Sequence, residues 1–278
     1  MGKAVTSPPE WRRRAAEGAL GLLDLPTPEW PAQALYALAA NGLRFPSGGS
    51  SPRPLDHREE AWLLLGLDRA GYSTSELCDA LDPAPGADLA SAALAGWACL
   101  ECGRVEGAER AAIFCRRFAW EQPDDVPGLL IEWRADHLMP EPIVRAHAGP
   151  QDFSAPALGA LFLARRFEAV GDFDDLDAAV ELHDLTVALG DDVWHPEHVE
   201  LGWAAALLYR VTGEEAFLAT AERMADVACE TQGRDGSWAA AALTATIAAA
   251  LVEMAEAVES REGVDEPAAD EPSGEMGG

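Results

Sequence analysis

The sequence contains almost no lysine, because Lys3 is the only one and every other basic residue is an arginine. Acidic residues outnumber basic residues by 48 to 20, which gives a formal net charge of −28 at pH 7. A surface of this charge repels nucleic acid and anionic membranes, so neither is expected as a partner. Both a GC-rich genome and a salt-adapted proteome produce this composition, and the sequence leaves the two alternatives open.

Long apolar segments are lacking as well. The longest apolar stretch, Trp238 to Val252, is shorter than the ~20 residues that cross a bilayer, so no membrane span is expected. No apolar run precedes Trp11, so a secretory signal is not expected either. With only five cysteines, these features predict a cytoplasmic protein with reduced thiols.

What the sequence does contain is a helical unit, seen most clearly from Thr212 to Trp238. Glu214 and Glu215 come first, where they suit the positive end of a helix dipole. Apolar residues then recur at helical spacing up to Gln232, and the stretch Gly233–Gly236 breaks the helix. Trp238 follows as a large anchor for the next helix.

The same unit recurs along the chain. The segment Gly103–Gln122 has the same length as Gly213–Gln232, and both enclose an amphipathic helix. A third, more divergent copy runs from Gly171 to Gly190 and continues into an aspartate pair and a tryptophan. Repetition of one helix–loop unit predicts a helical repeat architecture.

The segment Gln232–Trp238 resembles the glutamine–tryptophan motif of the squalene-cyclase and prenyltransferase superfamily. The resemblance implies an α/α toroid, with about twelve helices in inner and outer pairs. One departure is Val227, which stands where that family usually has an aromatic residue. Similar helix pairs occur in toroidal sugar-processing enzymes, so the motif indicates the fold more firmly than the chemistry.

The expected fold is therefore all-α, with residues 1–8 as a flexible N-terminus, 9–260 as one toroid and 261–278 as a disordered acidic tail. Residues 43–55 are expected to form a loop, either a connector or a lid. A short helix with a capping box is expected over 73–81. Inner helices are predicted to begin near Ala87, Pro127, Phe153, Glu197 and Ala239, and outer helices near Arg104, Phe173 and Glu214.

The loop over residues 191–198 is the main candidate for a functional site. Its polar residues are expected to serve as acid/base groups or metal ligands, and Trp194 as a wall. Inner helices would point their N-termini toward this end of a toroid, which favours anionic ligands there. The structural alternative is helix capping with histidines at the surface. The predicted catalytic residues are His195, His198, Asp191 and Asp192.

Three further tryptophans, Trp62, Trp97 and Trp203, are expected to join Trp194 as substrate-binding residues of an aromatic cavity that stabilises cations. Plain core packing is the alternative. No cofactor is expected, and the presence of a metal is left undecided by the sequence.

Two other motifs favour structural roles. The run Asp172–Asp175 spells the aspartate motif that resembles the proton donor of class II terpene cyclases, but it opens an outer rather than an inner helix. We therefore expect a solvated helix start. The pair Cys99 and Cys102 lacks a histidine nearby, so buried thiols are expected rather than zinc ligands.

The resemblance implies a small-molecule enzyme similar to terpenoid cyclases, that is, an isomerase or lyase acting on an apolar, isoprenoid-like ligand. Whether the chain is catalytic is left open. One alternative is a carbohydrate-acting toroid with paired carboxylates. Another is a non-catalytic repeat domain that binds a protein partner along its rim. A deep aromatic cavity favours the first, an open carboxylate-lined cavity the second, and a centre filled by side chains the third.

Overall fold

The computed structural model describes residues 6–25, 31–44, 56–74, 88–123, 128–134, 137–138, 143–145, 151 and 153–265. Within this part of the chain the structure is all-α apart from four two-residue strands, which confirms the expected fold class. Most of the segments 43–55 and 73–81 lies outside the described residues. The helices are α1 Pro8–Leu23, α2 Ala34–Ala40, α3 His57–Arg69, α4 Leu89–Glu101, α5 Val105–Trp120, α6 Ser154–Val170, α7 Phe173–Val187, α8 Val199–Thr212, α9 Glu215–Thr231 and α10 Ala241–Asp265.

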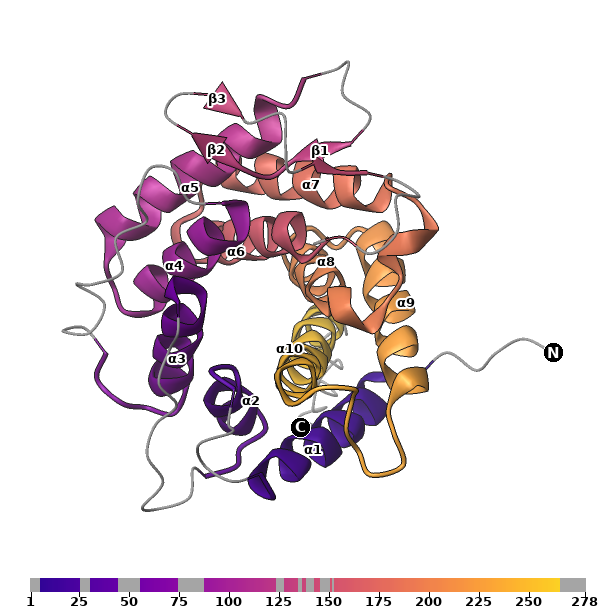
Figure 1. Cartoon of the computed structure of the whole chain (residues 1–278). Helices are drawn as coiled ribbons and strands as arrows, with labels where there is room; N and C mark the ends of the chain where they lie inside the picture. Colours follow the sequence, from indigo (N-terminus) through magenta and orange to yellow (C-terminus); the bar gives the residue numbers. More distant parts are fainter. Residues whose placement is uncertain are drawn as a thin grey trace, which may run out of the picture.

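The helices pack in two layers. Helices α2, α3, α4, α6, α8 and α10 each contact the next, and α10 returns to contact α2, so these contacts run full circle (Figure 1). A second layer covers this circle, with α5 on α4, α7 on α6, α9 on α8 and α1 on α10. The last of these pairs joins the two ends of the described chain.

The sequence of each pair explains its layer. Helix α8 is rich in alanine and leucine and is buried along nearly its whole length, whereas α9 buries one face and exposes residues such as Glu222. Gly202 lets the two helices approach, because a Cβ at this position would lie 2.7 Å from the Cβ of Met224. Gly213 ends α8 with φ of 76°, a left-handed conformation that suits glycine.

The prediction of an inner helix that begins near Pro127 and covers residues 127–138 is wrong. The described part of this segment forms short strands instead: β1 Leu129–Leu130 pairs with β4 Ile143–Val144, and β2 Trp133–Arg134 pairs with β3 His137–Leu138. Gln122 fixes the first strand, since its amide accepts from the N–H of Leu130 at 2.8 Å and donates to the Leu130 carbonyl at 3.0 Å. These tertiary bonds satisfy the backbone in an extended conformation.

The Gln232–Trp238 unit forms the compact joint expected from the sequence. Trp238 is buried and its indole N–H donates to the Ala228 carbonyl at 2.8 Å, in the last turn of α9. The Gln232 amide donates to the Gly236 carbonyl at 2.7 Å, which closes the loop. Gln122 likewise donates to a carbonyl beyond its helix, that of Leu130 in β1, so in two of the repeated units the glutamine bonds the backbone that follows the helix.

Both ends of the described chain have regular contacts or structure. The Thr6 backbone N–H donates to Asp226 of α9 at 2.7 Å, and the Trp11 indole donates to the Thr6 hydroxyl at 2.8 Å. Helix α10 continues to Asp265. Its segment Ala241–Arg261 is long and apolar enough to cross a membrane, yet 78% of the apolar window is buried within the fold, as in a core helix.

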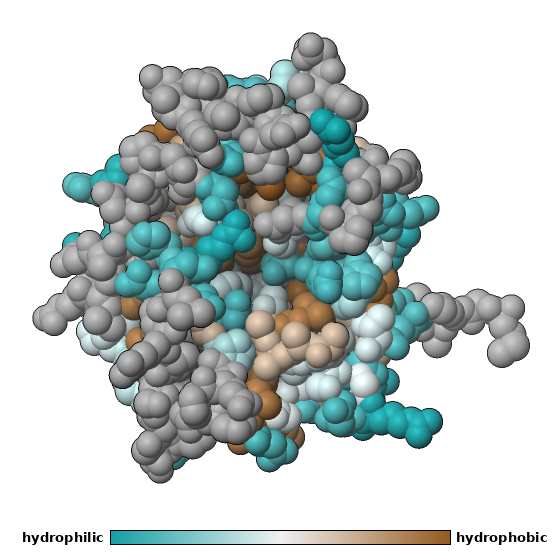
Figure 2. Space-filling view, in the orientation of Figure 1, coloured by the Kyte–Doolittle hydropathy of each residue, from teal (hydrophilic) through white to brown (hydrophobic). Residues whose placement is uncertain are grey.

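Hydrophilic side chains cover much of the face seen in Figure 2, as the net charge requires. A tan and brown patch interrupts them where Figure 1 shows the N-terminal end of α10. Ala239, Ala240 and Ala242 are exposed in this part of the chain.

Candidate functional site

Each helix of the circle directs one large side chain toward its centre, and these six side chains form the candidate site. They combine four aromatic rings with one cation and one anion. The residues are Tyr36 of α2, Trp62 of α3, Trp97 of α4, Arg165 of α6, Trp203 of α8 and Glu253 of α10.

The four rings, hereafter the central aromatic cluster, pack directly against one another. Trp97 lies 5.2 Å from Trp203 and 5.7 Å from Trp62 between ring centroids, with edge-to-face geometry in both pairs. Tyr36 contacts all three tryptophans at 5.6–5.9 Å. Edge-to-face contact at these distances is favourable aromatic packing, and it leaves no gap between the rings.

Arg165 caps this cluster. Its guanidinium carbon lies 4.6 Å from the ring centroid of Trp97 and 5.5 Å from that of Trp203, which is cation–π geometry. Helix α6 is apolar from Ala155 to Ala164, so Arg165 brings a charge next to a largely apolar part of the fold. Such a charge requires a partner.

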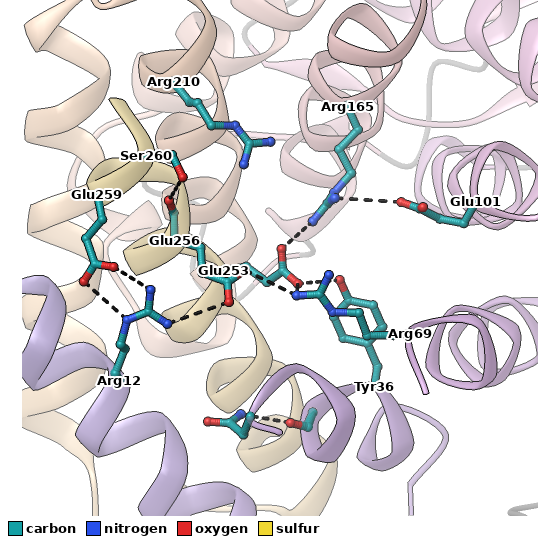
Figure 3. Close-up of polar contacts among 12 residues, drawn as sticks. Arg12, Tyr36, Arg69, Glu101, Arg165, Arg210, Glu253, Glu256, Glu259 and Ser260 are labelled. Carbon is teal, nitrogen blue, oxygen red and sulfur yellow. Dashed lines mark hydrogen bonds and ion pairs between the residues drawn. The ribbon is translucent and has the colours of Figure 1, made fainter. Parts of the chain in front are cut away.

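Glu253 supplies that partner (Figure 3). Its carboxylate accepts from the Arg165 guanidinium at 2.9 Å and from the Tyr36 hydroxyl at 3.0 Å, and it forms an ion pair with Arg69 at 3.0 Å. We call these four residues the Glu253 network. Its members come from four different helices, α2, α3, α6 and α10, so the network forms only when these helices are packed together.

The surroundings of the Glu253 network favour an ionised Glu253 and a neutral Tyr36. Burial raises the pKa of Glu253, but the charges of Arg165 and Arg69 and the hydrogen bond from Tyr36 outweigh it, and the pKa falls below its usual value. Burial likewise raises the pKa of the Tyr36 hydroxyl well above its ordinary value. At neutral pH Glu253 is therefore a carboxylate and Tyr36 a hydrogen-bond donor.

Further ion pairs extend the network toward the surface. Arg69 also contacts Glu256 at 3.3 Å, and Arg12 contacts Glu259 at 2.6 Å (Figure 3). Arg165 reaches Glu101 at 3.8 Å, and Glu101 accepts from the Trp97 indole at 2.8 Å. The charged groups at and near the centre are thus paired with groups of opposite charge.

The network lies toward the C-terminal ends of the ring helices. Arg69 and Glu101 are the last residues of α3 and α4, and an ion pair between Glu168 and Arg210 joins the last turns of α6 and α8. The loop at 191–198 precedes α8 and therefore lies at the other end. The polar groups of the Glu253 network therefore lie toward the end of the helices opposite the loop at 191–198, where the ligand site was predicted.

The loop itself contains two 3₁₀ turns, η3 Asp191–Val193 and η4 Pro196–His198. It brings His195 and His198 within 6.1 Å of each other between ring centroids. The two imidazoles have different surroundings, because His195 is exposed whereas His198 is buried edge-on against Phe153 at 4.9 Å. Asp191 and Asp192 are exposed, so the four residues do not share one enclosed space. Their catalytic roles stay predictions.

The tryptophans predicted to bind substrate fall into two groups. Trp62, Trp97 and Trp203 meet in the central aromatic cluster. Trp194 instead carries the Arg223 guanidinium at 3.8 Å from its ring centroid, and Arg223 also reaches Asp191 at 3.5 Å. Trp194 is therefore occupied by another part of the chain.

The expectation of a solvated helix start over Asp172–Asp175 is wrong for its last residue. Asp174 is exposed, but the Asp175 side chain is fully buried, where it pairs with Arg166 and lies 3.4 Å from Arg116. Burial raises the pKa of Asp175 to about 6, although both arginines oppose this shift. The helix α7 packs this residue against α5 and α6, which the helical period alone did not indicate.

The described residues contain no group of three or more potential metal ligands. Cys99 and Cys115 are buried free thiols, as expected, and burial raises the pKa of Cys115. Cys102 is disulfide-bonded, so the expectation of reduced thiols is wrong at this position.

Sequence reasoning missed Arg69, Arg165 and Glu253. A signal was present in two cases, since Arg165 and Glu253 each interrupt a helix of mostly small and apolar residues. A charge in such a helix requires a buried partner, but its identity follows only from the packing.

No family model matches this chain, and no curated protein matches it either.

Proposed function

We propose that the chain is an α/α toroid that acts as a non-catalytic binding domain for a protein partner. The circular contacts of α2, α3, α4, α6, α8 and α10, covered by a second helical layer, support the toroid. The observation that carries the function is the close packing of described side chains at the centre of the circle. Four aromatic rings and the Glu253 network occupy the position at which a toroidal enzyme would hold its substrate.

The electrostatics of the centre argue against cyclase chemistry at this position. A cyclase stabilises a carbocation over aromatic faces. Here the faces of Trp97 and Trp203 already carry the Arg165 guanidinium, so they are not free to stabilise a second cation.

Carbohydrate hydrolysis is also disfavoured there. It requires one carboxylic acid that is protonated before the reaction and a second carboxylate. Glu253 has a lowered pKa and is bound by two arginines, so it holds no proton to donate at neutral pH.

A terpenoid cyclase-like enzyme is the second candidate. One observation favours it: Trp62, Trp97 and Trp203 converge, and among the described residues the buried Trp203 indole N–H has no hydrogen-bond partner. An enzyme of this kind would need a cavity toward the loop-rich end, with the cluster as its floor and His195 and His198 at its mouth.

Two measurements distinguish these proposals. Purified protein is incubated with farnesyl diphosphate or with cellohexaose, the products are followed by mass spectrometry, and retained ligands are sought by native mass spectrometry. We expect no turnover and no retained isoprenoid or sugar. Turnover that is lost in His195→Ala would establish the enzyme instead.

The second measurement tests whether the tryptophans are packing or walls. Trp203→Ala should lower the free energy of unfolding by about 3–5 kcal/mol, as for a large core side chain. Trp194→Ala, at a half-buried position, serves as the matched control and should lose less. A Trp203→Ala variant as stable as the wild type would mean that Trp203 faces an open space.

A further inference from the structure

A groove of about 480 Å³ lies at the surface between the end of α5 and α7. These two helices are neighbours in the second layer (Figure 1). Apolar side chains form part of its walls, together with one aromatic ring and one carboxylate. Its lining includes Ala119, Trp120, Leu129, Glu181 and Leu185.

Three features of this groove, which we call the Trp120 groove, attract positive charge. Trp120 is 52% exposed, an unusual state for a tryptophan, and the face of an indole ring carries negative charge density. Glu181 is exposed and has no ion-pair partner among the described residues. The groove also lies at the end of α5, where the helix dipole is negative.

The chain contains an occupied version of the same arrangement. Arg223 lies over the face of Trp194 at 3.8 Å and reaches the Asp191 carboxylate at 3.5 Å. A tryptophan face and a neighbouring acid thus already hold a guanidinium in this protein. The Trp120 groove offers the same two kinds of group, and no cation from the described part of the chain is paired with either of them.

We propose that the Trp120 groove binds an arginine or lysine side chain from a basic segment of a partner protein. The proposal deepens the binding function proposed above and rests on it. The charge of −28 complements a basic partner and raises its rate of association. The apolar walls formed by Ala119, Leu129 and Leu185 suit the aliphatic stem of such a side chain, with its charged head between Trp120 and Glu181.

The test uses a fluorescent peptide with two arginines separated by alanine and leucine, and a second peptide in which citrulline replaces both arginines. Citrulline keeps the shape of arginine and removes its charge. Binding to the full chain is measured by fluorescence anisotropy at physiological salt. We expect the citrulline peptide to bind at least about tenfold more weakly, because cation–π and ion-pair contacts are both lost.

Variants then locate the site. Trp120→Leu should weaken binding of the arginine peptide by about tenfold, and Trp120→Phe by less, because a smaller aromatic face remains. Glu181→Gln should weaken it about two- to fivefold. Glu215→Gln makes the same charge change at another exposed position and should leave binding unchanged.

Several results would overturn the proposal. Equal binding of the citrulline peptide, or equal losses in Glu181→Gln and Glu215→Gln, would show that only the overall field of the protein acts. Agmatine that binds as tightly as the peptide would mean that the ligand is a small guanidinium compound. If the peptides fail these tests and no turnover is found, only the groove proposal is overturned and the proposed binding function still stands. Turnover of farnesyl diphosphate or cellohexaose would overturn the proposed binding function itself, regardless of the peptide results.

Discussion

Gln232 and Arg14 are bonded to each other through both ends of the glutamine amide. The Gln232 amide nitrogen donates to the Arg14 carbonyl at 3.0 Å, and the Arg14 guanidinium donates to the Gln232 amide oxygen at 3.1 Å. The two residues are 218 positions apart, so these bonds tie the first described helix to the last repeated unit.

Replacement of Gln232 should therefore open this junction. Gln232→Ala removes donors from two backbone carbonyls, those of Arg14 and Gly236, and we expect a loss of about 1–3 kcal/mol in the free energy of unfolding. Urea denaturation followed by circular dichroism measures it. Gln151→Ala is the control, because Gln151 bonds the backbone of Arg145, which is six residues away in the sequence. Equal stability of the two variants would contradict the role of Gln232.

Two glycines of α1 provide a matched pair. A Cβ at Gly18 would lie 2.6 Å from Cζ3 of Trp238, whereas a Cβ at Gly21 would meet nothing within 4 Å. Gly18→Ala should lose about 1–3 kcal/mol through overpacking. Gly21→Ala should gain about 0.5–1 kcal/mol from helix propensity. Thermal melts of both variants test this, and a stabilised Gly18→Ala would mean that α1 and Trp238 are not in contact.

The aspartates at the start of α7 should differ in their effect on stability. Asp175→Asn removes a buried carboxylate that pairs with Arg116 and Arg166, but burial already disfavours its charged form, so we expect a moderate loss of about 1–3 kcal/mol at neutral pH. Asp174→Asn changes an exposed residue and should stay within about 0.5 kcal/mol of the wild type. Chemical denaturation of both variants is the measurement. A stable Asp175→Asn would restore the solvated helix start.

Glu253 should make stability depend on pH. Its pKa is lowered in the folded state, so its contribution is fully present above its usual pKa in the unfolded chain, near 4.5. The contribution is lost as the pH falls below that value toward the folded-state pKa. Glu253→Gln should be less stable than the wild type at pH 7 by about 3 kcal/mol or more, and the difference should shrink in acid.

Melting temperatures of the two proteins between pH 7 and pH 3 test this prediction. Glu256→Gln is the control, since Glu256 is half-exposed three residues further along α10 and contacts the same Arg69. A Glu253→Gln variant with the same pH profile as the wild type would argue against the Glu253 network.

The sequence by itself determined the helices and their order. Apolar periodicity and residues such as Gly213 placed most of the predicted helix starts within two residues, because these signals act through local backbone geometry. The same local physics predicted the joint between Gln232 and Trp238. The helix prediction for residues 127–138 was wrong because hydrogen bonds from Gln122, a residue outside this segment, hold the chain extended at Leu130.

Only the tertiary structure decided which side chains meet. Tyr36 and Glu253 are 217 positions apart, yet they share a hydrogen bond at the centre of the circle of helices. A helix pattern states which face is buried but not which residue of another helix lies opposite it. Three features depend on which residues of neighbouring helices lie opposite each other: the burial of Asp175, the pairing of Arg165 with Glu253 and the exposure of Trp120. Each of them therefore follows only from the packing of the helices.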